Sequence, residues 1–341
     1  MIMAEGLGVQ EFFTRLGRVL ATKDMRSKHL LFLDLYEDFL SHRLAIAHDL
    51  PLESIAPYTH APIKPARHIK QGKLESSSGF ARALHAITHI EYSAVTLALD
   101  SAYRFRHLPY EYYADWLEVA EEEFRHFFLL DGLLGELGVQ YGDFAVHSNL
   151  YTASLETNVS LLYRMGVVHR GLEARGLDAN PFVLRKFAAS KHPMFGKIDE
   201  VLQCILRDEI GHVSKGDRWW KFALCSCGAS SHQAMQSTLP MRVVESIQAD
   251  VQALLRYGQL DSRVSKLWEE LALTQEQEDR EGRTQVAGDM GEQVFLALCA
   301  KFASFNLCGK IPNTKARLQC GFSEREIRQL ERFYALQKAR I

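Results

Sequence analysis

Four long stretches of the chain repeat apolar residues at helical spacing, and each carries a glutamate on its apolar side. They cover residues 79–105, 110–138, 150–176 and 196–224. Apolar residues that recur every three or four positions form one stripe along a helix, which faces a core. Four such helices joined by modest loops assemble most readily into an up-down bundle. The sequence therefore predicts an all-α fold built around a four-helix bundle.

The acidic residues occupy matching places in the two halves of this predicted bundle. A glutamate and a histidine at positions i and i+3 lie on the same face of a helix. The chain separates the first glutamate from the second by 32 residues, and the third from the fourth by 36. This spacing indicates two helical hairpins of similar size. In chain order, the residues are Glu91, Glu123-x-x-His126, Glu173 and Glu209-x-x-His212.

Acidic groups in an apolar bundle core require a counter-charge. An ionised carboxylate is costly there unless it is paired or bound to a metal, and four glutamates cannot neutralise one another. Two divalent cations would balance them, and two neutral imidazoles would add nitrogen ligands, as in carboxylate-bridged di-iron and di-manganese bundles. The sequence thus predicts a two-metal site whose ligands are Glu91, Glu123, His126, Glu173, Glu209 and His212.

Some neighbours of these ligands are candidates for supporting roles. Glu122 and Asp208 each precede a ligand, where a carboxylate can fix the tautomer of a ligating histidine; an ordinary surface charge is an equal alternative. His169 is either a further ligand, a supporting residue or a histidine satisfied in the core, and we favour the last. Glu156 competes with Glu173 for the third stretch. We favour Glu173 because it lies on the apolar stripe and Glu156 lies beside it.

The remaining chain predicts helical additions at both ends of the bundle. Residues 8–49 predict two amphipathic helices, and a linker with four prolines follows over residues 51–65. In the C-terminal third we expect a helix near residues 240–258 and a surface loop or frayed helix over 274–293. A capping box of Ser323 and Glu326 begins a last helix.

These features predict three parts. Residues 1–60 hold N-terminal helices and the linker, residues 61–235 the di-metal four-helix bundle, and residues 236–341 a C-terminal helical extension that packs on the bundle.

Charge and cysteine content restrict the compartment and the partners. The formal net charge is −2, which gives no global attraction to nucleic acid, although a basic stretch at residues 64–73 leaves RNA open. No apolar run reaches 18 residues, and Glu5 and Glu11 interrupt any secretory signal, so we expect neither a membrane span nor export. Six cysteines without a C-x-x-C pair indicate reduced thiols and a cytoplasmic protein.

Several segments resemble the bacterial ferritin-like family called domain-of-unknown-function family 455. The resemblance is carried by GFARALHAITHIEYSAVTLALDSAYRF, DWLEVAEEEFRHFFLLDGLLGELGVQYGDFAVH, GLEARGLD and ILRDEIGHVSKGDRWW. The resemblance covers about residues 60 to 225, and a weaker similarity to the family lies in FNLCGKIPNTKARLQCGF. The chain departs from the family in a longer region at about residues 235 to 300.

This resemblance implies a ferritin-like bundle with a di-metal centre and assigns each ligand a role. By position, Glu123 and Glu209 would bridge the two metals, and Glu91 and Glu173 would be terminal ligands. The histidines His126 and His212 would then bind one metal each. The family supplies no substrate.

Two functional hypotheses follow, and a third is weaker. The first is an oxidoreductase that uses O₂ or peroxide on an unknown small-molecule substrate, with an unknown electron donor. Oxygen-rich sites suit redox metals, so we expect iron first, then manganese or a mixed pair. The alternative is a protein that binds, stores or senses iron or manganese without turnover. A bundle merely stiffened by metal is the weakest reading, and the oligomeric state is open.

Overall fold

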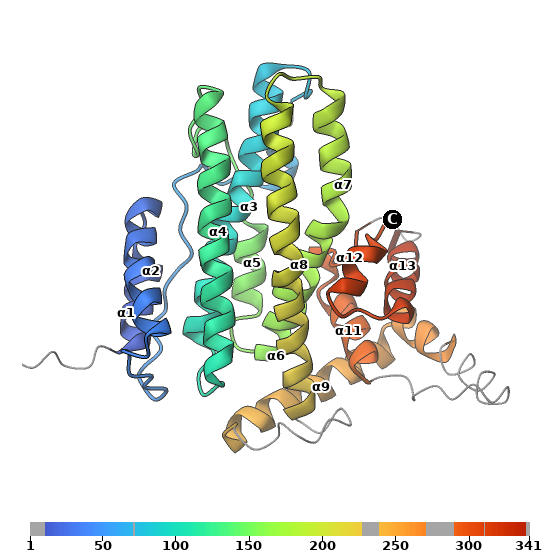
Figure 1. Cartoon of the computed structure of the whole chain (residues 1–341). Helices are drawn as coiled ribbons and strands as arrows, with labels where there is room; N and C mark the ends of the chain where they lie inside the picture. The colour runs from blue at the N-terminus through green and yellow to red at the C-terminus, as the bar shows by residue number, and fades with distance from the viewer. Residues whose placement is uncertain (1–10, 71, 227–238, 271–289, 310, 339–341) are drawn as a thin grey trace, which may run out of the picture. The chain divides into compact units, whose positions relative to one another are not determined.

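The structure is a computed structural model that describes residues 11–70, 72–226, 239–270, 290–309 and 311–338 (Figure 1). Every regular element in these residues is a helix, which confirms the predicted all-α class. The chain divides into two compact units, Met1–Tyr151 and Thr152–Ile341, and each is described by itself. The predicted three-part division at residues 60 and 235 stays a prediction.

The first unit begins with two short helices, as predicted for residues 8–49. They are α1 (Phe12–Ala21) and α2 (Met25–Leu40). The Glu11 carboxylate accepts hydrogen bonds from the backbone N–H groups of Phe13 and Thr14, so it satisfies donors that the first turn of α1 leaves open. The following linker contains no helix until η1 (Ala66–His68), in agreement with its prolines.

A long helical hairpin forms the core of the first unit. The helices α3 (Ser77–Arg104) and α4 (Tyr110–Glu136) lie side by side (Figure 1), within two residues of the predicted bounds. The Ser76 hydroxyl caps α3 by accepting from the N–H of Gly79. Apolar residues of both stripes, such as Leu84 and Trp116, are fully buried. The sequence therefore predicted correctly which faces of α3 and α4 are buried.

The second unit departs from prediction where one helix was expected over residues 150–176. This segment consists of α5 (Asn149–Glu156), α6 (Leu161–Tyr163), the π-helix η2 (Arg164–Leu172) and α7 (Glu173–Ala189). The break at residues 157–160 is stabilised by polar side chains. The Thr157 hydroxyl donates to the Ala153 carbonyl, and the Ser160 hydroxyl accepts from the N–H of Tyr163. The prediction of a single helix was wrong because these side chains compete for the backbone.

The same break corrects the predicted stripe of this segment. Helical spacing alone would place Leu155 and Val159 in the core, yet they are 55% and 84% exposed. A stripe can be extrapolated only along an unbroken helix, since the break changes the direction of every residue before it. Leu162 and Gly166, which follow the break, are buried as expected.

Helix α7 also runs through Asn180-Pro181, beyond residue 176 where the third predicted stretch ends. Proline has no N–H, so Pro181 cannot donate to the carbonyl of Leu177. The side-chain amide of Asn313 donates to that carbonyl instead, at 3.3 Å. A residue far along the chain thus satisfies the acceptor that the proline leaves open.

The rest of the second unit consists of one long helix and a group of shorter ones. Helix α8 (Phe195–Ser226) packs against η2 and α7, and α9 (Met241–Leu260) packs against α11 (Met290–Lys301). The predicted helices at 196–224 and 240–258 are confirmed. Further helical residues are 262–270, η4 (Ala303–Phe305), α12 (Thr314–Gln319) and α13 (Glu324–Lys338).

Two smaller expectations fall in this region. The predicted loop or frayed helix over residues 274–293 lies outside the described residues up to 289, and its last residues begin α11. Half of the predicted capping box forms, because the Ser323 hydroxyl accepts from the N–H of Glu326. The carboxylate of Glu326 does not complete the box and binds Arg170.

Within the part of the chain that the structure describes, no helix combines the length and apolar character that a membrane span requires.

Candidate metal centre

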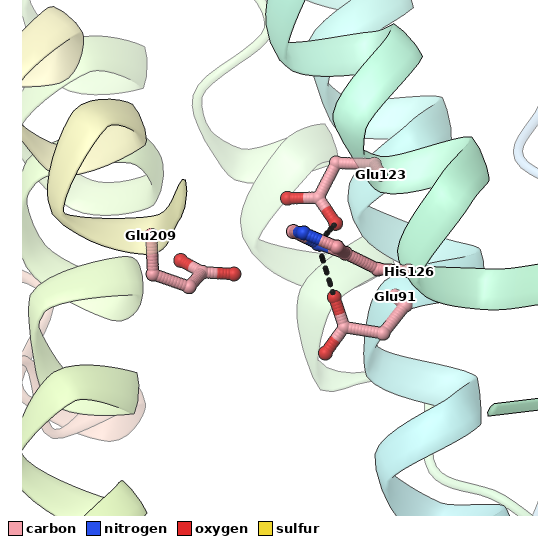
Figure 2. A group of neighbouring side chains, drawn as sticks. All are labelled: Glu91, Glu123, His126 and Glu209. Atoms are coloured by element: carbon pink, nitrogen blue, oxygen red, sulfur yellow. Dashed lines mark hydrogen bonds and ion pairs between the residues drawn. The ribbon is translucent and has the colours of Figure 1, made fainter. Parts of the chain in front are cut away.

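The hairpin of the first unit brings together three of the predicted ligands. Glu91 extends from α3, and Glu123 and His126 extend from the same face of α4 (Figure 2). Nδ1 of His126 lies 3.4 Å from Oε2 of Glu123 and 3.5 Å from Oε2 of Glu91. One potential ligand atom from each of the three residues lies within 4.8 Å of the others. All three side chains are buried.

The charge of this cluster would favour a bound cation. Two carboxylates and one imidazole lie close together, and all three are buried. Burial alone would lower the pKa of the His126 imidazole, but the hydrogen bonds and negative charges of Glu123 and Glu91 outweigh burial. They raise the pKa well above its usual value. A proton on His126 therefore compensates part of the buried negative charge, and a divalent cation would do so more completely. The buried cluster could hold a metal ion.

The second unit presents the same sequence motif on α8. Glu209, which Figure 2 also labels, is one turn before the fully buried His212, and its Oε2 lies 3.9 Å from Nδ1 of that histidine. Glu173 opens α7 directly after the π-helix, and its Oε1 lies 3.0 Å from Nδ1 of His169. In this unit the predicted ligands Glu209 and His212 thus form one Glu–His pair on α8, and Glu173 forms a second pair with His169 at the η2–α7 junction.

The backbone of α8 approaches the π-helix closely at His169. A Cβ added to Gly216 would lie 2.6 Å from the His169 carbonyl oxygen and 2.9 Å from its Cβ. Any other residue at position 216 would push α8 away from η2. The glycine therefore fixes the distance between the helix that carries Glu209 and the helix turn that carries His169.

The supporting residues have partners of their own. Glu122 lies 3.9 Å from the Arg125 guanidinium, and the Asp208 carboxylate accepts from the Cys204 thiol at 3.8 Å. Their predicted role on the ligating histidines stays a prediction, as does the complete set of six ligands. Glu156 is exposed, and the His169–Glu173 contact places His169 beside a predicted ligand.

A group of buried ion pairs in the second unit was missed by the sequence analysis. Arg170 and Arg317 are almost completely buried, and each binds a buried carboxylate from a distant part of the chain. The partners are separated by 156 and 139 residues, so no local spacing relates them. In the sequence, Arg170 directly precedes GLEARGLD and Asp178 ends it, but nothing in that segment indicates their distant partners.

Comparisons with known proteins agree with the sequence resemblance at the level of the family. The family described as "Protein of unknown function (DUF455)" matches residues 21–258. A relative from Haemophilus influenzae, an uncharacterized protein, is 36% identical over 225 residues, which cover 62% of this chain and 77% of the relative. No solved structure gives a significant match. The family match extends over most of the chain, so the protein belongs to the DUF455 family.

Proposed function

We propose that this protein is a di-metal carboxylate protein in which the α3–α4 hairpin and the α7–α8 pair combine into one ferritin-like bundle. Glu209 would join the cluster of Glu91, Glu123 and His126, and His212 and Glu173 would complete the site. The observation that carries this proposal is the buried cluster on α3 and α4. Its support is the repetition of the Glu-x-x-His motif on α8 and of a Glu–His contact at Glu173.

The donor set fits iron or manganese better than a structural zinc ion. Carboxylate oxygens and imidazole nitrogens suit these metals, and the six residues include no thiolate. When bound, a pair of such ions would supply two-electron redox chemistry toward O₂ or peroxide. The six residues would hold the ions, and the burial of Glu91 and Glu123 would limit the access of water to them. His126 must release its proton to become a ligand, because a metal binds the neutral imidazole.

The favoured activity is that of an oxidoreductase acting on a small molecule with a separate electron donor. Iron or manganese storage or sensing is the alternative outcome. Cytoplasmic location and the absence of a nucleic-acid partner remain predictions from composition.

A direct test measures the metals bound by protein purified without added metal, and then by protein loaded with ferrous iron without oxygen. We expect about two ions per chain. Glu123→Gln should lose most of the metal, because it removes a ligand from the cluster. Glu121→Gln is the matched control on the same helix, two residues earlier and half-buried, and it should bind metal as the wild type does.

Mixing the ferrous protein with O₂ separates the two functions. Oxygen uptake faster than that of free ferrous iron, lost in Glu123→Gln, supports the oxidoreductase. If two metals bind but oxygen uptake shows no such excess, storage or sensing becomes the proposed function in place of the oxidoreductase. A wild type that binds no metal under either condition would refute the metal centre.

A further inference from the structure

Two residues that flank Glu173 in the sequence form buried arginine–carboxylate pairs. The partner in each pair lies near the C-terminal end of the chain. Arg170 precedes Glu173 by three residues and binds Glu326 of α13. Asp178 follows Glu173 by five residues and binds Arg317 of α12. We call these two pairs the C-terminal clamp. Both C-terminal partners lie beyond residue 258, where the family match ends.

The first pair is fully engaged. The Arg170 guanidinium donates from Nη1 and Nη2 to the two carboxylate oxygens of Glu326, both at 2.8 Å, and from Nε to Asp217 at 2.8 Å. The rings of Phe295 and Phe322 lie 4.1 and 4.0 Å from the guanidinium carbon. Burial disfavours the charge, but Glu326 and Asp217 outweigh it and raise the pKa of Arg170. The π-helix is thereby held by both α8 and α13.

The second pair is also bidentate. The Asp178 carboxylate accepts from Nε and Nη2 of Arg317, at 2.9 and 2.7 Å. It also accepts from the backbone N–H groups of Gly309 and Asn313, at 3.0 and 2.8 Å. Four hydrogen bonds therefore fix the first half of α7, which begins at Glu173, to α12 and to the residues just before it.

The π-helix between these anchors requires such support. Long π-helices are rare, because their geometry is less favourable than that of an α-helix. An unfavourable backbone persists only where its surroundings hold it in place. If η2 (Arg164–Leu172) relaxed into an α-helix, the residues at one end would shift by one position, a rotation of about 100°. The side chains of His169 and Glu173 would then point in different directions from those they have now.

We propose that Arg170 and Glu326 are positioning residues for the metal centre, and that the C-terminal clamp holds the π-helix in the register that presents Glu173 as a ligand. This inference rests on the proposed function, because it takes Glu173 as a metal ligand. The inference also means that the C-terminal segment, which the family match does not include, helps to position a metal ligand.

The test compares full-length Glu326→Gln with Glu324→Gln. The control residue lies on the same helix two positions earlier, and its carboxylate is 71% exposed in a surface pair with Arg328. The first measurement is amide hydrogen exchange of residues 164–172 in metal-free protein. The second is titration with Co²⁺, followed by the visible absorption of the bound ion, which reports the ligand geometry.

We expect Glu326→Gln to exchange faster over residues 164–172, to bind Co²⁺ about 10- to 100-fold more weakly, and to show an altered Co²⁺ spectrum at a temperature where the protein is folded. Glu324→Gln should match the wild type in all three. If Glu326→Gln does not fold, Asp217→Asn keeps Glu326 in place, removes the negative charge beside Arg170 Nε together with the ion pair to Lys221, and should show the same changes to a smaller extent.

The possible failures are distinguishable. A wild type that binds no Co²⁺ would refute the proposed metal function, whatever the exchange shows. Unchanged exchange in Glu326→Gln would show that the clamp does not hold the π-helix. Faster exchange with an unchanged Co²⁺ affinity and spectrum would show that the clamp stabilises the fold without positioning a ligand. Either of the last two results overturns the inference.

Discussion

Asp178 and Arg317 form a buried, bidentate ion pair although 139 residues separate them in the chain. The side chain of each is almost inaccessible to water. Arg317 stays charged because the hydrogen bonds and charge of Asp178 counteract its burial, and its pKa is raised. This one contact fixes the C-terminal segment to helix α7.

We therefore expect Asp178→Asn to destabilise the protein strongly. The substitution keeps the shape of the side chain but leaves a buried guanidinium without its counter-charge, which costs about 3–5 kcal/mol of unfolding free energy. Urea unfolding measures the change. Arg328→Gln breaks an exposed pair on α13 and should cost less than about 1 kcal/mol. Equal effects of the two substitutions would contradict the importance of the buried pair.

A second prediction follows from the break at residues 157–160, before the π-helix. Val159 is 84% exposed, so Val159→Asp should change the unfolding free energy by no more than about 0.5 kcal/mol. Val167 lies in the π-helix and is fully buried, so Val167→Asp should cost at least about 3 kcal/mol or prevent folding. Thermal unfolding followed by circular dichroism distinguishes them. A large loss in Val159→Asp would favour the unbroken helix that periodicity alone suggests.

A third prediction concerns the acid side of the stability profile. His85 is buried on α3, and its Nε2 accepts a hydrogen bond from the N–H of Gly142 at 2.9 Å. Burial lowers the pKa of His85 from 6.5 to about 4. Between these values the unfolded chain binds a proton that the folded protein does not. The stabilising contribution is therefore complete above pH 6.5 and is lost as the pH falls toward 4.

The loss at this site amounts to about 3 kcal/mol at most. His85→Asn, whose side-chain carbonyl can accept from Gly142, should reduce the fall in unfolding free energy between pH 6.5 and 4. Urea unfolding at several pH values measures it. His68 is exposed, and His68→Asn should leave the profile of the wild type unchanged. Parallel profiles for His85→Asn and the wild type would show that His85 does not titrate as inferred.

The helices that follow regular apolar stripes could be predicted from the sequence. The stripe through Leu84 and that through Trp116 gave the bounds of α3 and α4 within two residues, because helical periodicity is a local property. The same periodicity placed Glu91, Glu123 and His126 on inward faces, and the structure brings these three side chains together. Residues spaced by i and i+3 on one helix have a fixed relative direction that needs no tertiary information.

Prediction failed where a distant residue changes the local backbone. Helix α7 continues past Pro181 because Asn313 satisfies the Leu177 carbonyl, and a local pattern holds no trace of that partner. The π-helix is also invisible to a search for α-helical spacing, since its backbone hydrogen bonds join residues five apart instead of four.

The sequence by itself determined the all-helical class, the two Glu-x-x-His motifs and the side of each helix on which they lie. These depend on side chains a few residues apart, whose relative positions the helix geometry sets. Only the tertiary structure decided the break at residues 157–160, the π-helix before Glu173 and the pairing of Arg170 with Glu326 and Asp178 with Arg317. The physical reason is that a buried charge needs a partner close in space, and the chain can supply it from any distance in sequence.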